Sequence, residues 1–244
     1  MKECSKSIAR RLSNSNFSNK YFRGEGVDIG GKPDPLKMYQ SLFPLMQDVR
    51  TWDWEDGDAQ FLASVGDSEF DFVHSSHCLE HLMDPKEGLR NWIRVLKPDG
   101  YLVLTVPDED MYEQGIFPST FNLDHKWTFT IYKYSSWSDR SINVIDLVRS
   151  IGDDVCIEKI ELLNSTYRDE FPRYDQTITP IGECGIEVVI RKRVKDEIAN
   201  KGKLPKQVKL GKEHRIHLNQ YKDDQAAMKN NNQTKPPFTN DADI

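Results

Sequence analysis

Short apolar runs separated by amphipathic stretches dominate the first 190 residues of the chain. Most of these runs are followed by glycines, prolines or polar residues, which is typical of buried strands that end in tight turns. The longest continuous run has the character of a strand that is covered on both faces. Six strands are predicted in this way, at residues 26–29, 49–52, 70–74, 101–106, 156–163 and 186–190.

Apolar residues at helical spacing predict helices between these strands. The clearest helix follows the third strand, where Asp84 can be the N-cap, Pro85 fits the first helical position and Glu87 occupies the place of a capping-box acid. A turn is predicted at 97–100, before the fourth strand. The other predicted helices lie near the N-terminus, where a loop leading inward follows the helix, and at 36–46 and 142–151.

Strands that alternate with helices predict an α/β fold with a Rossmann-like, mostly parallel twisted sheet and helices on both faces. The last two strands are joined by a loop at 164–185 rather than by a helix, so we expect an antiparallel pair at one edge. Large apolar residues become scarce near the C-terminus. The predicted organisation is one domain at 1–194 and a polar, flexible tail at 195–244.

Charge is distributed unevenly along the chain, whose net charge is −6. Residues 195–244 hold 10 basic and 7 acidic residues (+3), which leaves −9 for the rest. Because nucleic-acid binding needs many phosphate contacts from Lys and Arg, an acidic body argues against a nucleic-acid surface. Segment 191–215, with 10 basic and 3 acidic residues, could meet an anionic partner, but a solvated, flexible tail is the favoured interpretation.

The cysteines and the apolar runs indicate in which cellular compartment the protein is expected. The four cysteines are widely spaced and form no C-x-x-C pair, which favours reduced thiols in a cytoplasmic protein. No apolar run approaches the roughly 18–20 residues that cross a bilayer, and residues 1–12 do not resemble a secretory signal. We therefore expect no membrane partner. The sequence does not determine the oligomeric state.

Polar residues follow each of the first four strands. A sheet of this kind binds ligands at the carboxyl ends of its strands, so these residues are the candidates for a site. Glycines let a ligand approach the backbone closely, and a carboxylate can accept hydrogen bonds from an ammonium group, a ribose or an adenine amine. The candidates after strands one to three are Asp28, Gly30, Gly31, Asp53, Asp58, Ala59, Ser76 and His77.

Four segments in order resemble the small class I, S-adenosylmethionine-dependent methyltransferases of the type 11 group. They are VDIGG (27–31), WDWEDGDAQ (52–60), SEFDFVHSSHCLEHLMDP (68–85) and RVLKPDGYLVLTVPD (94–108). Two features depart from the family pattern. Lys32 stands where the family usually has another glycine, and only about 22 residues separate Gly31 from Asp53, so the usual third strand is short or missing.

The resemblance implies S-adenosylmethionine as cofactor and assigns roles to the candidates. Asp28, Gly30 and Gly31 would hold its methionine end, and Ser76 and His77 would line the site from below. Asp53 would hold the ribose, with Asp58 and Ala59 beside the adenine. Because the two segments are so close in sequence, the roles of Asp53 and Asp58 could be exchanged.

The segment at 111–130 is rich in polar and aromatic residues and is predicted to face the methyl acceptor, which we expect to be a small molecule or sugar-like compound. An irregular loop whose aromatic residues merely cover the sheet is the alternative. An oxygen or nitrogen acceptor can require a general base. The candidates are His125, Glu113 and Glu109.

Other functions fit the sequence less well. A methyltransferase-like fold without activity would serve as a binding module. His77, Glu80 and His81 match the H-x-x-E-H signature of zinc hydrolases, but His77 directly follows a strand and no separate third ligand is evident, so we expect no metal. Gly26 to Lys32 resembles a phosphate-binding loop, yet Pro33 replaces the residue that would hold magnesium, and no dinucleotide fingerprint follows the first strand.

Overall fold

A six-stranded sheet forms the centre of the protein in the computed structural model, which describes residues 3–205 and residue 211. The strand order is β2-β1-β3-β4-β8-β7; β1 to β4 are parallel, and β8 is antiparallel to both β4 and β7. This confirms the α/β class and the antiparallel edge pair. The strands are β1 (Gly24–Ile29), β2 (Met46–Trp52), β3 (Phe70–Ser76), β4 (Leu96–Pro107), β7 (Val155–Leu163) and β8 (Gly185–Lys192).

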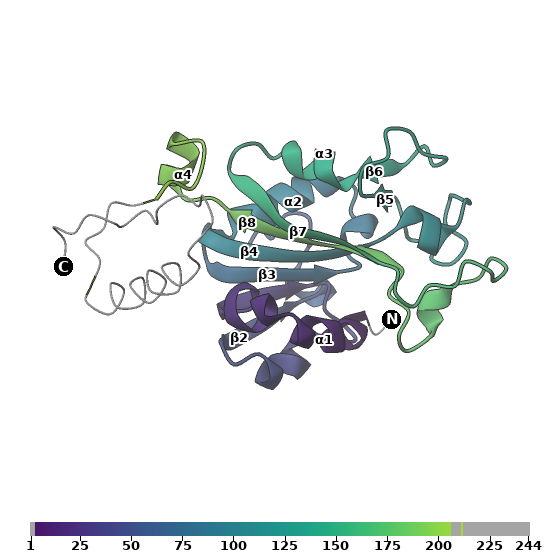
Figure 1. Cartoon of the computed structure of the whole chain (residues 1–244), viewed down its shortest axis with the longest axis horizontal. Coiled ribbons are helices and arrows are strands. Elements are labelled where there is room, and N and C mark those ends of the chain that lie inside the picture. The colour runs from purple at the N-terminus through teal and green to yellow at the C-terminus, as the bar shows by residue number, and fades with distance from the viewer. Residues whose placement is uncertain (1–2, 206–210, 212–244) are drawn as a thin grey trace, which may run out of the picture. The chain divides into compact units, whose positions relative to one another are not determined.

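Helices cover both faces of the sheet, as predicted (Figure 1). One face packs α2 (Pro85–Arg94) and α3 (Val144–Arg149) in a core that includes Trp92 and Leu102. The other face packs α1 (Glu3–Ser13), a π-helical turn at Phe17–Tyr21 and a 3₁₀ helix at Leu36–Leu42. The strands between these two cores are therefore buried on both sides, which explains their continuous apolar runs.

The strand expected in the family between the second strand and the next helix does not occur here, since β2 is the edge strand of the described sheet. The short spacing between Gly31 and Asp53 already indicated this. As a result, the chain after β2 returns directly over a 3₁₀ turn at Trp54–Asp56 toward β3. The ends of β1, β2, β3 and β4 meet at one edge, where the candidate residues gather.

Several local predictions need correction. Asp84 is the N-cap of α2, but Glu87 accepts a hydrogen bond from Gln60 Nε2 (2.8 Å) and does not close a capping box. The Gln60 side chain instead accepts from the Asp84 backbone N–H (2.9 Å). The turn predicted at 97–100 lies within β4, at an irregularity where Asp99 has φ 68°. The loop expected after α1 is the π-helical turn at Phe17–Tyr21.

Two other helices are shorter than predicted. The segment at 36–46 is a 3₁₀ helix that ends at Leu42, because β2 begins at Met46. At 142–151 the first residues pair as β6 (Ser141–Asn143) with β5 (Thr128–Thr130) in a small parallel ladder. Asn143 then caps α3, since its side chain accepts from the Asp146 N–H. Short 3₁₀ or π turns also occur at Leu79–His81, Glu109–Glu113 and Gln176–Ile178.

The compact unit ends at Gly202, beyond the boundary predicted at residue 194. The reason is α4 (Lys195–Ala199), whose Glu197 pairs with the buried Arg191. Lys192 donates to the backbone oxygens of Arg94 and Leu96, so the first basic residues of segment 191–215 are used inside the fold. Most of the predicted tail, at 206–210 and 212–244, lies outside the described residues.

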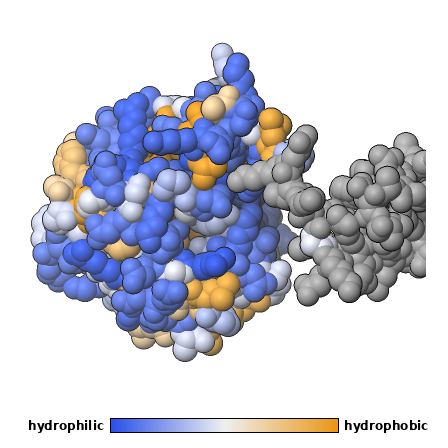
Figure 2. Space-filling view, turned by 90° about the vertical axis from the view of Figure 1, so that its left-hand side faces the viewer, coloured by the Kyte–Doolittle hydropathy of each residue, from blue (hydrophilic) through white to orange (hydrophobic). Residues whose placement is uncertain are grey.

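All four cysteines are free thiols. Among the described helices, none combines the length and the apolar character that crossing a bilayer requires. Figure 2 shows one face of the molecule, where hydrophilic residues predominate and apolar residues form separate small patches. These observations are consistent with the acidic, polar composition of the body.

Candidate functional site

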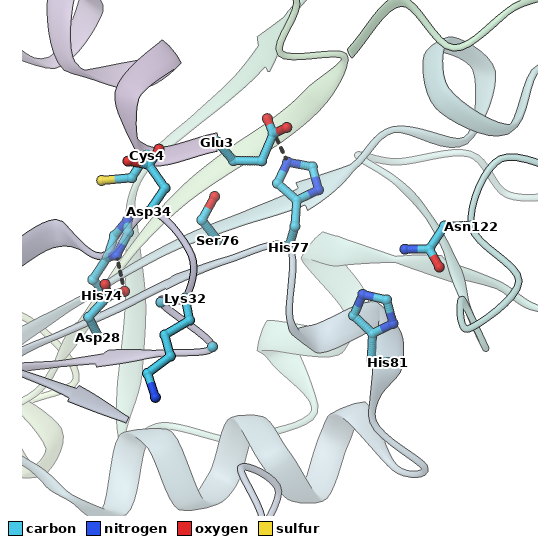
Figure 3. Close-up of a pocket in the computed structure, with 12 residues that line it drawn as sticks. Glu3, Cys4, Asp28, Lys32, Asp34, His74, Ser76, His77, His81 and Asn122 are labelled. Atoms are coloured by element: carbon cyan, nitrogen blue, oxygen red, sulfur yellow. Dashed lines mark hydrogen bonds and ion pairs between the residues drawn. The ribbon is translucent and has the colours of Figure 1, made fainter. Parts of the chain in front are cut away.

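A cavity of about 200 Å³ lies at the edge where β1 and β3 end (Figure 3). Five of the eight predicted cofactor residues line it: Asp28, Gly30, Gly31, Ser76 and His77. Residues that the sequence analysis did not select complete the lining, among them Glu3 and Cys4 from α1, Lys32, Asp34, His74, His81 and Asn122. The sequence brings α1 to this edge because its apolar face packs on the sheet, a contact that no motif indicates.

The turn after β1 requires glycine at two positions. Gly30 has φ 72°, and a Cβ there would lie 2.8 Å from the Cβ of Cys78. A Cβ on Gly31 would lie 2.4 Å from Oδ2 of Asp28. The first position is fixed by backbone conformation as well as space, and the second by space alone. The two glycines thus let the turn pack closely against the side chains of Cys78 and Asp28.

Asp28 holds the turn to its surroundings. Its Oδ2 accepts from the Leu36 N–H (2.7 Å) and its Oδ1 lies 2.6 Å from His74 Nδ1. A carboxylate offers about four lone-pair positions, so these two bonds leave room for an ammonium donor. The predicted role of Asp28 at the methionine end of the cofactor is compatible with this geometry and stays a prediction.

A buried chain of polar groups connects Asp28 to β8 on the face of the sheet that α1 covers. Arg11 of α1 donates to Glu187 Oε2 (2.9 Å) and bonds His74 Nε2 (2.9 Å). Because arginine only donates, His74 Nε2 is the acceptor, so its proton lies on Nδ1 and is donated to Asp28. The N-terminal helix, β8, β3 and the glycine turn are thereby fixed to one another. Sequence reasoning missed Arg11 and His74.

Asp53 ties β2 to the glycine turn. Its Oδ2 accepts from the Lys32 N–H (2.9 Å) and its Oδ1 from the Trp54 N–H (2.8 Å). Lys32, the residue that replaces the family's glycine, extends its side chain to Glu55 in an exposed ion pair (2.8 Å). Such a pair contributes little to stability. The side chain of Lys32 is therefore not held rigidly in place at the cavity.

Asp58 and Ala59 lie farther along the same segment. Asp58 Oδ1 accepts from the Gln60 N–H (2.7 Å), and the carbonyl of Ala59 accepts from Trp92 Nε1 (2.8 Å). Neither residue lines the cavity, and Asp53 reaches it only through Lys32. The structure thus gathers the residues after β1 and β3, while the predicted ribose and adenine residues border that group.

His77 follows β3 in a left-handed conformation, with φ 54°. The helical turn that follows spans only Leu79–His81, so His77 and His81 do not share the helix face that the zinc-hydrolase interpretation needs. A different group of residues comes together instead, and it does not include His77. Glu80, His81 and His125 each bring one potential ligand atom to within 4.8 Å of the others.

The three predicted catalytic residues occupy two different settings. His125 Nδ1 lies 2.7 Å from Glu113 Oε1, and both side chains are buried. Glu109 is also buried, but Lys133, Thr128 and two serines occupy both of its oxygens. The structure therefore brings His125 and Glu113 together as a pair and places Glu109 in a separate cluster under β5 and β6.

Burial changes the acidity of two groups at this edge. It raises the pKa of the Cys4 thiol to about 12, so this cavity residue stays protonated at neutral pH. Burial and the nearby charge of Asp110 raise the pKa of Asp108 to about 6, against the hydrogen bonds from the backbone N–H groups of Met111 and Asp110. Asp108 is the first residue after β4 and caps the turn that carries Glu113.

Comparisons with known proteins agree with this architecture. A family model described as "Methyltransferase domain" matches residues 13–146. No curated protein matches the sequence. A candidate methyltransferase from Bacillus halodurans has a similar fold, with 14% identity, coverage of 76% of this chain and 98% of that one, and a TM-score of 0.50.

Two further similar structures have lower TM-scores. One is a chain in the complex between the Haloferax volcanii Trm112 methyltransferase activator and a candidate methyltransferase (16% identity, 77% and 88% coverage, TM-score 0.49). The other is an S-adenosylmethionine-dependent methyltransferase from Aquifex aeolicus (14% identity, 78% and 89% coverage, TM-score 0.45).

Proposed function

The chain belongs to the methyltransferase-domain family of class I, S-adenosylmethionine-dependent enzymes, and from this premise we propose that it methylates a small-molecule or sugar-like acceptor. The observation that carries the proposal is the cavity at the carboxyl ends of β1 and β3, whose wall is the glycine turn at Gly30 and Gly31. Ligands of open α/β sheets bind at this edge.

The cofactor would lie along the edge from the glycine turn toward the end of β2. Asp28, Gly30 and Gly31 would receive its methionine end, with Ser76 and His77 below it. At about 200 Å³ the cavity is below the roughly 300 Å³ typical of ligand sites, so we expect its boundary near Lys32 to move on binding. That movement would expose Asp53 to the ribose, and Asp58 with Ala59 to the adenine.

When bound, S-adenosylmethionine supplies an activated methyl group at its sulfonium. The protein's own contribution is to orient the acceptor, exclude water and take up the proton that an oxygen or nitrogen acceptor releases. The segment at 111–130 is attached to the cavity edge, since the Lys126 N–H donates to the Glu80 carbonyl (2.9 Å). We propose that this segment receives the acceptor. His125, oriented by Glu113, is fully buried, so it would act on the acceptor through an intervening group and not by direct contact.

Glu109 fits this role less well, because all of its lone pairs face residues of its own cluster. The acidic body supports a small acceptor rather than a nucleic acid, whose phosphates require basic contacts. The hydrolase interpretation loses its basis, since residues 77–81 do not form one helix.

Calorimetric titration with S-adenosylmethionine tests the proposal. We expect binding to the wild-type protein and a loss of roughly 10-fold to 100-fold in affinity for Asp53→Ala, because hydrogen bonds to a charged group contribute about 1.5–3 kcal/mol. Asp53→Asn should bind with intermediate affinity, since it retains one acceptor oxygen. Asp48→Ala is the matched control in β2, the strand that precedes Asp53, where Asp48 pairs with Lys37 at the surface.

The result of this titration distinguishes an enzyme from a protein that serves only as a scaffold. A folded protein that gives no heat with S-adenosylmethionine or with its demethylated product would be an inactive binding module. For a protein that binds, incubation with labelled cofactor and pooled cell metabolites should identify an acceptor that gains about 14 mass units, the replacement of a proton by a methyl group.

A further inference from the structure

We propose that Glu80, His81 and His125 form a binding site for a divalent transition-metal ion. Glu80 and His81 come from the turn after β3, and His125 comes from the segment that covers it. The side chains of Glu80 and His125 are fully buried, and that of His81 is 26% exposed. Two imidazoles and one carboxylate are ligands that zinc and related first-row metals accept. This departs from the expectation, based on the sequence alone, that no metal is bound.

The potential ligand atoms already converge. One atom from each residue lies within 4.8 Å of the other two, and the rings of His81 and His125 have centroids 4.9 Å apart. Metal–ligand distances of about 2.0–2.2 Å place ligand atoms roughly 3–4 Å apart. The side chains therefore need to contract by about an ångström, which rotation about their side-chain bonds can supply.

In the described part of the chain, the atoms that would face the ion have no hydrogen bond, and the nearest other polar group is His77 Nδ1, 3.3 Å from Glu80 Oε1. Within the described residues, both carboxylate oxygens of Glu80 and Nε2 of His125 are buried without a hydrogen bond. The distance between His125 Nε2 and Glu80 Oε1 is 3.9 Å, which is too long for one. Buried polar groups are nearly always satisfied, and each exception requires an explanation. A cation between these atoms would satisfy all of them.

Both histidines are oriented by a carboxylate on the opposite ring nitrogen. Glu113 Oε1 lies 2.7 Å from His125 Nδ1, and Asp124 Oδ2 lies 2.9 Å from His81 Nδ1. Histidines that ligate metals commonly donate their second N–H to such a carboxylate, which fixes the tautomer and leaves Nε2 free to coordinate. This arrangement occurs twice here, on both histidines of the cluster.

The site adjoins the candidate cofactor cavity. His81 lines that cavity together with His77 and Asn122, at the end opposite Asp28 and Lys32 (Figure 3). An ion held by three protein ligands keeps an open coordination position for an oxygen ligand and lowers the pKa of a bound hydroxyl. His125 is too deeply buried to touch an acceptor directly, so a metal explains how it could serve one. Only this role rests on the proposed function; metal binding itself does not.

Metal titration of the full-length protein tests the site in the absence of S-adenosylmethionine. After removal of metal with a chelator, we expect uptake of one Zn²⁺ or Co²⁺ per chain, with a Co²⁺ absorption spectrum of nitrogen and oxygen coordination. Glu80→Gln, His81→Gln and His125→Gln should each abolish this uptake. Glu113→Gln should weaken it by roughly 10-fold to 100-fold, since it removes only the orienting carboxylate.

Two controls define the background. Glu87→Gln makes the same chemical change as Glu80→Gln at the start of α2, where Glu87 bonds Gln60, and should retain full uptake. His214 and His217 lie outside the described residues, so all variants are also prepared with both replaced by alanine. If His125→Gln does not fold, the partly exposed His81→Gln and the orienting Glu113→Gln still report on the site.

Absence of uptake by the protein lacking His214 and His217 would overturn the proposal, as would uptake that the three ligand substitutions leave unchanged. Calorimetry with S-adenosylmethionine keeps this outcome separate from the proposed function. Cofactor binding without metal uptake refutes only the metal site. Metal uptake without cofactor binding refutes only the methyltransferase.

Discussion

Replacement of Arg11 by methionine tests the buried chain of polar groups that fixes the glycine turn. Arg11 is fully buried in α1 and bonds Glu187, His74 and Thr105. Methionine retains much of the side-chain length but none of the donors, and it removes the guanidinium that lies over the Phe17 ring. The substitution therefore removes one partner of a buried ion pair and the donor on which the tautomer of His74 depends.

The expected loss of stability depends on which partners Glu187 and His74 keep after the substitution. Breaking a buried ion pair costs about 3–5 kcal/mol when the remaining charge is left alone. Glu187 keeps Arg10 (2.8 Å) and Lys159 (2.7 Å), so its charge stays compensated and the low end applies. His74 Nε2 becomes a buried acceptor without a donor, which costs about 1–3 kcal/mol. Together these two costs give an expected loss of about 4–6 kcal/mol.

Urea unfolding of the two proteins measures this loss as a lower midpoint with an unchanged slope. Arg10→Met is the matched control: Arg10 bonds Glu183 and Glu187 but is 21% exposed, so it should cost about 1 kcal/mol. We also expect Arg11→Met to weaken S-adenosylmethionine binding, because Asp28 loses its fixed partner. Equal losses for the two variants would refute the idea that Arg11 is central to this network.

Further predictions concern the turn and the group after β4. Gly31→Ala should lower the free energy of unfolding by about 1–3 kcal/mol and weaken cofactor binding at least 10-fold, because its Cβ would lie 2.4 Å from the Asp28 carboxylate. Gly202→Ala, with open space around the new Cβ, is the control. Equal behaviour of the two variants in urea unfolding and calorimetry would contradict this prediction. Asp108 has a raised pKa of about 6, so its contribution to stability is fully present below pH 4 and is lost as the pH rises through 6. The Asp108→Asn variant should therefore be more stable than wild type by on the order of 1–3 kcal/mol at pH 7–8, but not at pH 4. Urea unfolding at each pH measures this difference. A difference in stability that stays constant with pH would show that Asp108 does not titrate in this way.

Features encoded by local pattern could be predicted from the sequence. The apolar runs in β1, β3 and β4 are covered on both faces, so they left a clear signal. The N-cap at Asp84 was also predictable, since capping depends on residues within one turn. The sequence also predicted that the family's usual third strand would be short or missing, and β2 is the edge strand of the described sheet.

Features that depend on contacts between distant segments were missed. Nothing near Arg11 in the sequence indicates that it would meet His74 under the glycine turn. The 44 positions that separate His81 from His125 give no distance, and so the H-x-x-E-H match was left without a third ligand. Glu87 fitted a capping box locally, but the Gln60 amide, 27 residues away, took its carboxylate. In each case a tertiary partner decided the role of the residue.

A crystal structure of the protein with S-adenosylhomocysteine would examine most directly whether this edge of the sheet is a cofactor site. The account predicts the amino-acid end of the ligand against the backbone of Gly30 and Gly31, within reach of Asp28, and its ribose hydroxyls on the Asp53 carboxylate. A ligand bound elsewhere, or a cavity between Asp28 and His81 that stays empty at saturating ligand, would contradict it.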